Sequence, residues 1–131
     1  MRGSPLADAS GWIQADPETL QISDDRIWAV GDAAGLRTPD TGTFTAKTGL
    51  LARIEAEVAA RNIAMIIEGA SPRFRYQGKG GLLVWDSLSR ARYFLIRHYA
   101  HPRPFTWLSP PSRALHWAKM AMERYWLARW L

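Results

Sequence analysis

The chain has 131 residues, seven of them tryptophan, and carries a formal net charge of +5. It contains no cysteine, which excludes disulfide bonds, cysteine-ligated metals and thiol catalysis within the chain. No run of 18 apolar residues occurs and no signal peptide is predicted, so no segment is expected to cross a bilayer as a helix. The length suits one domain or part of one.

Charge is divided unevenly along the chain. Residues 1–65 hold six Lys or Arg against nine Asp or Glu, whereas residues 66–131 hold eleven against three. Four of the seven tryptophans lie in the last 25 residues. A basic half rich in Trp suggests an anionic partner, either nucleic acid or lipid headgroups.

The first half predicts a strand, a loop and a long helix. The apolar run at residues 26–30 stops at Gly31-Asp32, which is typical of a buried parallel strand followed by a tight loop. A helix is expected to begin near residues 43–45 and to run to Glu68, because apolar residues recur at helical spacing and Gly69 stands where a C-terminal cap belongs.

The second half predicts a hairpin and a final helix. Residues 74–76 and 82–85 are expected to pair as strands around a Gly-rich turn at residues 77–81. Three further segments complete the chain: a third strand or a short helix at 91–97, an irregular proline-rich stretch at 100–112, and a helix from Arg113 to the end, capped by Ser112.

The Gly-Asp that ends the first predicted strand has a possible use in ligand binding. Loops at the carboxyl ends of parallel strands form the ligand crevice of open α/β sheets. Gly31 allows close approach, and the Asp32 carboxylate can accept hydrogen bonds from sugar-like hydroxyls. The start of the next helix offers free N–H groups. Together they could hold a polyol and an electron-rich ring, although the dipeptide alone is usually just a turn.

Two segments carry a resemblance to a known family. Residues 16–21 followed by 27–33 (Ile-Trp-Ala-Val-Gly-Asp-Ala) resemble the second FAD-binding signature of the pyridine nucleotide-disulfide oxidoreductases. Residues 45–49 (Thr-Ala-Lys-Thr-Gly) and the helix end at 59–63 are similar to the Pro-Lys-Thr-Gly helix of members like sulfide:quinone reductase and type II NADH dehydrogenase. Order and spacing match over residues 5–69 and more loosely over 70–131.

The resemblance implies a fold and a set of ligand contacts. It implies an α/β fold, with the C-terminal part of a Rossmann-like FAD-binding domain in residues 1–70, then a small hairpin region and a membrane-associating amphipathic helix in residues 71–131. Asp32 would hydrogen-bond the ribityl chain of FAD, with Gly31 giving it room. Lys47, Thr48 and Gly49 would sit at the pyrimidine end of the flavin ring and favour its anionic reduced form. No catalytic residue is assigned.

Two departures from the family pattern limit what this chain can do alone. The Gly-x-Gly-x-x-Gly fingerprint, which lies near the N-terminus of the family's long chains, is missing, so the adenosine and pyrophosphate of FAD have no site here. The redox cysteine that sulfide:quinone reductases carry in the segment matching residues 76–84 is also missing. Persulfide chemistry is therefore not supported, and a donor such as NAD(P)H is an alternative. The chain is expected to be an inactive portion that aggregates or pairs, either with the missing half or with a second copy.

The final helix is expected to lie on a membrane surface. Helical spacing separates an apolar row rich in aromatic side chains from a basic row, which is typical of an interfacial helix. The apolar row consists of Ala114, Trp117, Ala118, Ala121, Met122 and Tyr125. A peripheral location on the cytoplasmic face follows from the resemblance, and Phe94, Phe105 and Trp107 could line a quinone entrance unless they simply fill a core.

Other interpretations remain open. His98, His101 and His116 form no ligand pattern and are expected to be surface histidines, so no metal site is predicted. A non-enzymatic basic module binding acidic lipid or nucleic acid would fit the charge of the second half. It would leave the acidic first half and the Gly-Asp and Lys-Thr-Gly spacing unexplained, so nucleic acid is not the preferred partner. A small protein that only packs as a scaffold is the third possibility.

Overall fold

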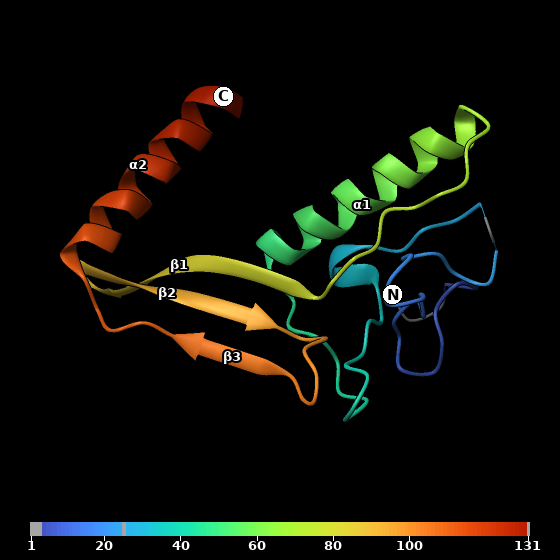
Figure 1. The fold of residues 1–131 in the computed structure, drawn as a ribbon, viewed down its shortest axis with the longest axis horizontal. Helices are drawn as coiled ribbons and strands as arrows, with labels where there is room; N and C mark the ends of the chain where they lie inside the picture. The colour runs from blue at the N-terminus through green and yellow to red at the C-terminus, as the bar shows by residue number, and fades with distance from the viewer. Residues whose placement is uncertain (1–3, 25, 131) are drawn as a thin grey trace. The chain divides into compact units, whose positions relative to one another are not determined.

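A computed structural model, which describes residues 4–24 and 26–130, has a mixed α/β fold (Figure 1). The chain forms two compact units, Met1–Gly80 with Arg97–Pro104, and Gly81–Ile96 with Phe105–Leu131. The elements in chain order are the 3-10 turn η1 (Gly31–Ala33), helix α1 (Gly49–Ile67), strands β1 (Lys79–Ser87), β2 (Arg90–Arg97) and β3 (Phe105–Leu108), and helix α2 (Arg113–Trp130). The predicted α/β class is confirmed. The predicted boundary after residue 70 concerns domains of a longer protein and stays a prediction.

The segment before η1 is extended but pairs less than expected. Trp28 forms an isolated antiparallel bridge with Gln21, and the Ala29 N–H donates to the Leu20 carbonyl at 3.0 Å. Residues 26–30 therefore do not form a regular strand, because the segments beside them are short loops that offer only single pairing positions. Their apolar character still places Ala29 in the core of the first unit.

Helix α1 begins later than predicted and ends where expected. Its first residue is Gly49, because Thr48 is extended and its hydroxyl accepts the Leu51 N–H at 3.3 Å. At the other end Gly69 adopts a left-handed conformation with φ 76°, which closes the helix as predicted. The face buried against the rest of the unit carries Leu51, Glu55, Ala59 and Asn62, spaced by four, four and three residues.

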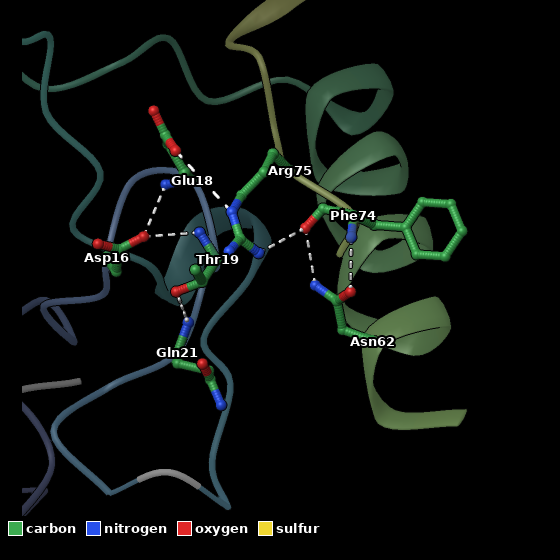
Figure 2. Close-up of polar contacts among 7 residues, drawn as sticks. All are labelled: Asp16, Glu18, Thr19, Gln21, Asn62, Phe74 and Arg75. Atoms are coloured by element: carbon green, nitrogen blue, oxygen red, sulfur yellow. Dashed lines mark hydrogen bonds and ion pairs between the residues drawn. The ribbon is translucent and has the colours of Figure 1, made fainter. Parts of the chain in front are cut away.

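A polar network fixes the loops against α1 (Figure 2). The Asp16 carboxylate accepts the N–H groups of Glu18 and Thr19, at 2.9 and 2.6 Å, which shapes the turn leading to the fully buried Leu20. Farther along, Phe74 is hydrogen-bonded to Asn62 instead of pairing as a strand. The predicted strand at residues 74–76 is therefore wrong.

The three strands form one antiparallel sheet in the order β1-β2-β3. The tip of the β1–β2 hairpin falls at residues 88–89, so the predicted turn at 77–81 is wrong. Gly80 and Gly81 lie within β1, where a Cβ on Gly81 would come within 1.8 Å of the Tyr93 hydroxyl. These glycines thus serve close packing rather than a turn.

The remaining predictions for the second half are mixed. Residues 91–97 form a strand, which is one of the two predicted alternatives. The stretch at residues 100–112 was expected to be irregular but contains strand β3. Helix α2 begins at Arg113 as predicted, and the Ser112 hydroxyl accepts the Ala114 N–H at 3.1 Å. Neither helix of the described residues has the length and apolarity needed to cross a bilayer.

Candidate functional site

The turn η1 needs a glycine at its first position. Gly31 has φ 63°, a conformation that L side chains rarely adopt, and a Cβ there would lie 3.1 Å from the Ala52 Cβ. The turn packs on the first part of α1 and places the next side chain, Asp32, in an exposed position. Within the described residues no group hydrogen-bonds the Asp32 carboxylate, so its oxygens are available to a ligand.

The start of α1 presents unengaged donors beside this turn. Thr48 accepts the Leu51 N–H through its side chain and the Ala52 N–H through its carbonyl. In the part of the chain that the structure describes, the Gly49 and Leu50 N–H groups have no protein acceptor. Gly49 is exposed, with no atom within 4 Å of the position that a Cβ would take. A ligand atom with negative charge is favoured at such a helix start.

Lys47 turns back onto η1 rather than out over the helix. Its ammonium donates to the carbonyl oxygens of Gly31, at 3.4 Å, and Ala34, and lies 5.2 Å from the centre of the Trp12 ring. Burial lowers the pKa of Lys47, and the nearby Glu55 and Asp32 carboxylates oppose that shift. These contacts explain how a cation is accommodated just before a helix N-terminus, where the dipole alone would disfavour it.

Glu55 is a site residue that the sequence did not reveal. Its side chain is 3% exposed, and its Oε2 accepts the Gly31 N–H at 2.6 Å. Burial raises the pKa of Glu55, while the Gly31 hydrogen bond and the Lys47 charge act in the opposite direction. The signal that could have found it is its position in the buried row of α1, where an ionisable side chain needs a specific partner.

The structure brings together the five residues predicted to bind the cofactor, all in the first unit around η1 and the start of α1. The three predicted quinone residues lie in the second unit. Phe94 is half-buried on β2, and Phe105 and Trp107 are 47% and 46% exposed on β3. A cavity of about 510 Å³ in this unit is lined instead by Trp85, Asp86, Ser87, Leu88 and His116. The quinone role of the three aromatics stays a prediction.

His98 is not a surface histidine. Its ring is half-buried, its Nε2 accepts the Ala46 N–H at 3.1 Å, and burial lowers its pKa. The contact ties the segment before Lys47 to the loop after β2. Among the described residues, no group of three or more His, Asp or Glu side chains is placed to hold a metal ion.

Comparison with known proteins gives a weak similarity over part of the chain. No protein-family model matches it. A stretch of 79 residues, 60% of the chain, is 28% identical to the mitochondrial sulfide:quinone oxidoreductase of Mus musculus. The stretch spans only 16% of that enzyme's length. The chain is thus distantly similar to a short part of an oxidoreductase.

Proposed function

We propose that this chain is the part of an FAD-dependent oxidoreductase that holds the ribityl chain and the flavin ring. The observation that carries the proposal is the exposed Asp32 carboxylate, which accepts no hydrogen bond from the described residues and lies on a turn packed against the N-terminal part of α1. A carboxylate suits the ribityl hydroxyls, and the free N–H groups of Gly49 and Leu50 suit the electron-rich pyrimidine end of the ring. The bound flavin supplies the electron-transfer chemistry.

The proposed electron acceptor is a quinone. The similarity to sulfide:quinone oxidoreductase supports this assignment, and the exposed Phe105 and Trp107 offer flat apolar surfaces on which a quinone ring can stack. The donor is left open, because a chain without cysteine cannot itself form a persulfide.

The flavin proposal predicts that Asp32→Asn weakens binding of flavin mononucleotide by about 10- to 100-fold. Hydrogen bonds to a charged acceptor are worth about 1.5–3 kcal/mol, which corresponds to that range. Quenching of flavin fluorescence by the full chain measures the affinity. Asp40→Asn, in an exposed loop of the same unit, serves as the matched control and should bind as the wild type does.

The same titration separates the alternatives. Because the adenosine half of the cofactor has no site in this chain, FAD and flavin mononucleotide should bind with similar affinity. A wild-type chain that binds neither flavin, or an Asp32→Asn chain that binds as tightly as the wild type, would contradict the proposal.

We further propose that α2 attaches the protein to an anionic membrane surface on the cytoplasmic side. The half-buried positions of the helix are Leu115, His116, Lys119, Met120 and Glu123, so it packs within its unit through that row. The His116 ring packs edge to face against Trp85, with ring centres 4.8 Å apart, and Lys119 lies over the same Trp85 ring. The apolar row faces solvent instead: Trp117 and Tyr125 are 66% and 62% exposed. Trp130, at the end of the helix, is 70% exposed. Exposed Trp and Tyr beside arginines suit the headgroup region of a bilayer.

Removing two of these side chains is expected to release the chain from vesicles. The double change Trp117→Ala and Trp130→Ala should lower binding to vesicles of phosphatidylcholine and phosphatidylglycerol by at least about 100-fold, since burial of one large apolar side chain is worth about 1.5–3 kcal/mol. Co-flotation of protein with vesicles measures this. Ile67→Ala, which shortens an apolar side chain that is 80% exposed at the end of α1, is the control. Stronger, salt-sensitive binding to single-stranded nucleic acid would favour the other partner instead.

A further inference from the structure

A buried carboxylate supports the turn that carries Asp32. Glu55 belongs to α1, 24 residues after Gly31, and its Oε2 lies 2.6 Å from the Gly31 nitrogen. The side chain is 3% exposed in a row otherwise occupied by Leu51, Ala59 and Asn62. Packing alone would favour an apolar residue at this position, because burying a carboxylate is costly unless it is paired. The buried Tyr76 hydroxyl also interacts with this carboxylate, but the hydrogen bond to Gly31 is the contact that links Glu55 to the turn.

Two oppositely charged side chains hold the turn, one through an N–H group of the turn and the other through its carbonyl groups. The Glu55 carboxylate accepts the Gly31 N–H, and the Lys47 ammonium donates to the carbonyl oxygens of Gly31 and Ala34. Both side chains come from α1 or the residues just before it, so the turn is fixed relative to the helix start that offers the free N–H groups. Asp32 follows Gly31 in the chain and precedes Ala34, and its side chain is left exposed.

We propose that Glu55 is a positioning residue that fixes the Gly31–Asp32 turn so that the Asp32 carboxylate meets a hydroxyl-bearing ligand at the start of α1. The proposal rests on the flavin function proposed above. In this arrangement Glu55 does not touch the ligand. It acts through the Gly31 amide, and Lys47 completes the same clamp rather than contacting the flavin with its charge.

Amide hydrogen exchange, followed by NMR on the full chain, tests the clamp without any ligand. In Glu55→Ala the Gly31 amide should exchange at least about ten-fold faster than in the wild type, and Ala59, in the middle of α1, should be unchanged. Glu55→Gln keeps an oxygen acceptor in the same place and should restore slow exchange. Glu57→Gln, on the exposed face of the same helix, is the matched control.

Flavin mononucleotide affinity, measured on the same variants, tests the positioning. Glu55→Ala should bind at least about ten-fold more weakly, and Glu55→Gln should bind as the wild type does. Faster exchange throughout the unit in Glu55→Ala, without recovery in Glu55→Gln, would mean simple destabilisation and would overturn the proposal. Unchanged Gly31 exchange in Glu55→Ala would overturn it as well.

A second measurement covers the case in which Glu55→Ala does not fold. The Gly31 amide proton should shift upfield from the wild type to Glu55→Gln, because a neutral acceptor replaces a charged one. The Gly35 amide, which donates to the Ile13 carbonyl at 2.7 Å, should not move. An unmoved Gly31 proton would overturn the clamp. If the wild type binds no flavin while the Gly31 exchange responds as expected, the flavin function fails and the clamp is retained.

Discussion

Replacing Gly31 with alanine is expected to destabilise the first unit by about 2–3 kcal/mol. The residue has φ 63°, where a Cβ costs about 1–2 kcal/mol, and that atom would meet the Ala52 Cβ at 3.1 Å. A Cβ atom is fixed to its backbone, so neither atom can rotate away from this contact. The backbone of the turn must therefore shift away from α1. Urea denaturation, followed by far-ultraviolet circular dichroism, measures the change as a lower midpoint.

Gly49→Ala is the matched control for this change. Gly49 is the first residue of α1 and has open space around it, so an added methyl group should be neutral or stabilise by about 0.5–1 kcal/mol. The same methyl group would stand where the flavin is proposed to approach, so this variant should lose flavin affinity without losing stability. A Gly31→Ala chain that unfolds at the wild-type midpoint would show that the turn is not tied to α1 in the way described.

Local signals predicted the helices well. The last turn of α1 was found from Gly69, and the start of α2 from Ser112, because each cap is a short-range hydrogen-bond pattern visible in the sequence. The predicted start of α1 is too early, because the threonines at 43, 45 and 48 all resemble caps. Only Thr48 has its hydroxyl against a helical N–H.

Tertiary packing decided the elements that were missed. The glycines at 78, 80 and 81 predicted a turn, yet Gly80 and Gly81 lie in β1, where Leu51 and Tyr93 approach the backbone. Strand β3 was not predicted because the prolines around it disfavour strands in general. They lie outside its four residues and so do not interrupt it. Such contacts join residues far apart in the chain and leave no local pattern.

The candidate site was only partly predictable, because local order along the chain is visible in the sequence and tertiary contacts are not. Gly31, Asp32 and the Lys-Thr-Gly segment could be recognised because they stand in order at the ends of elements. Their hydrogen-bond partners could not be recognised in this way. The helical pattern alone assigns no role to Glu55, and only the packing of η1 on α1 shows that its carboxylate meets the Gly31 amide.

Replacing Asn62 with alanine is expected to have the second large effect on stability. Asn62 is 1% exposed and makes two hydrogen bonds with the backbone of Phe74, accepting its N–H and donating to its carbonyl, both at 2.9 Å (Figure 2). Alanine would leave the Phe74 N–H without its side-chain acceptor, and the Phe74 carbonyl would keep only the longer contact with the exposed Arg75 guanidinium, at 3.3 Å. A loss of about 2–4 kcal/mol is expected, because each buried unpaired group costs about 1–3 kcal/mol.

The effect should extend to the core, because Phe74 leads directly to Tyr76. The Tyr76 ring is 1% exposed, and its N–H donates to the Glu18 carbonyl at 2.8 Å. Freeing the Phe74 backbone therefore loosens the attachment of this core side chain, and Tyr76 amide exchange should accelerate together with the fall in the urea midpoint.

Arg75→Ala is the control from the same network. Arg75 makes a long ion pair with Glu18, at 4.0 Å, and a hydrogen bond to the Phe74 carbonyl, at 3.3 Å. Both are solvent-exposed, so their loss should cost only about 0.5 kcal/mol. Equal losses in the two variants would mean that the buried amide contributes no more than a surface charge, contrary to its burial and its paired geometry.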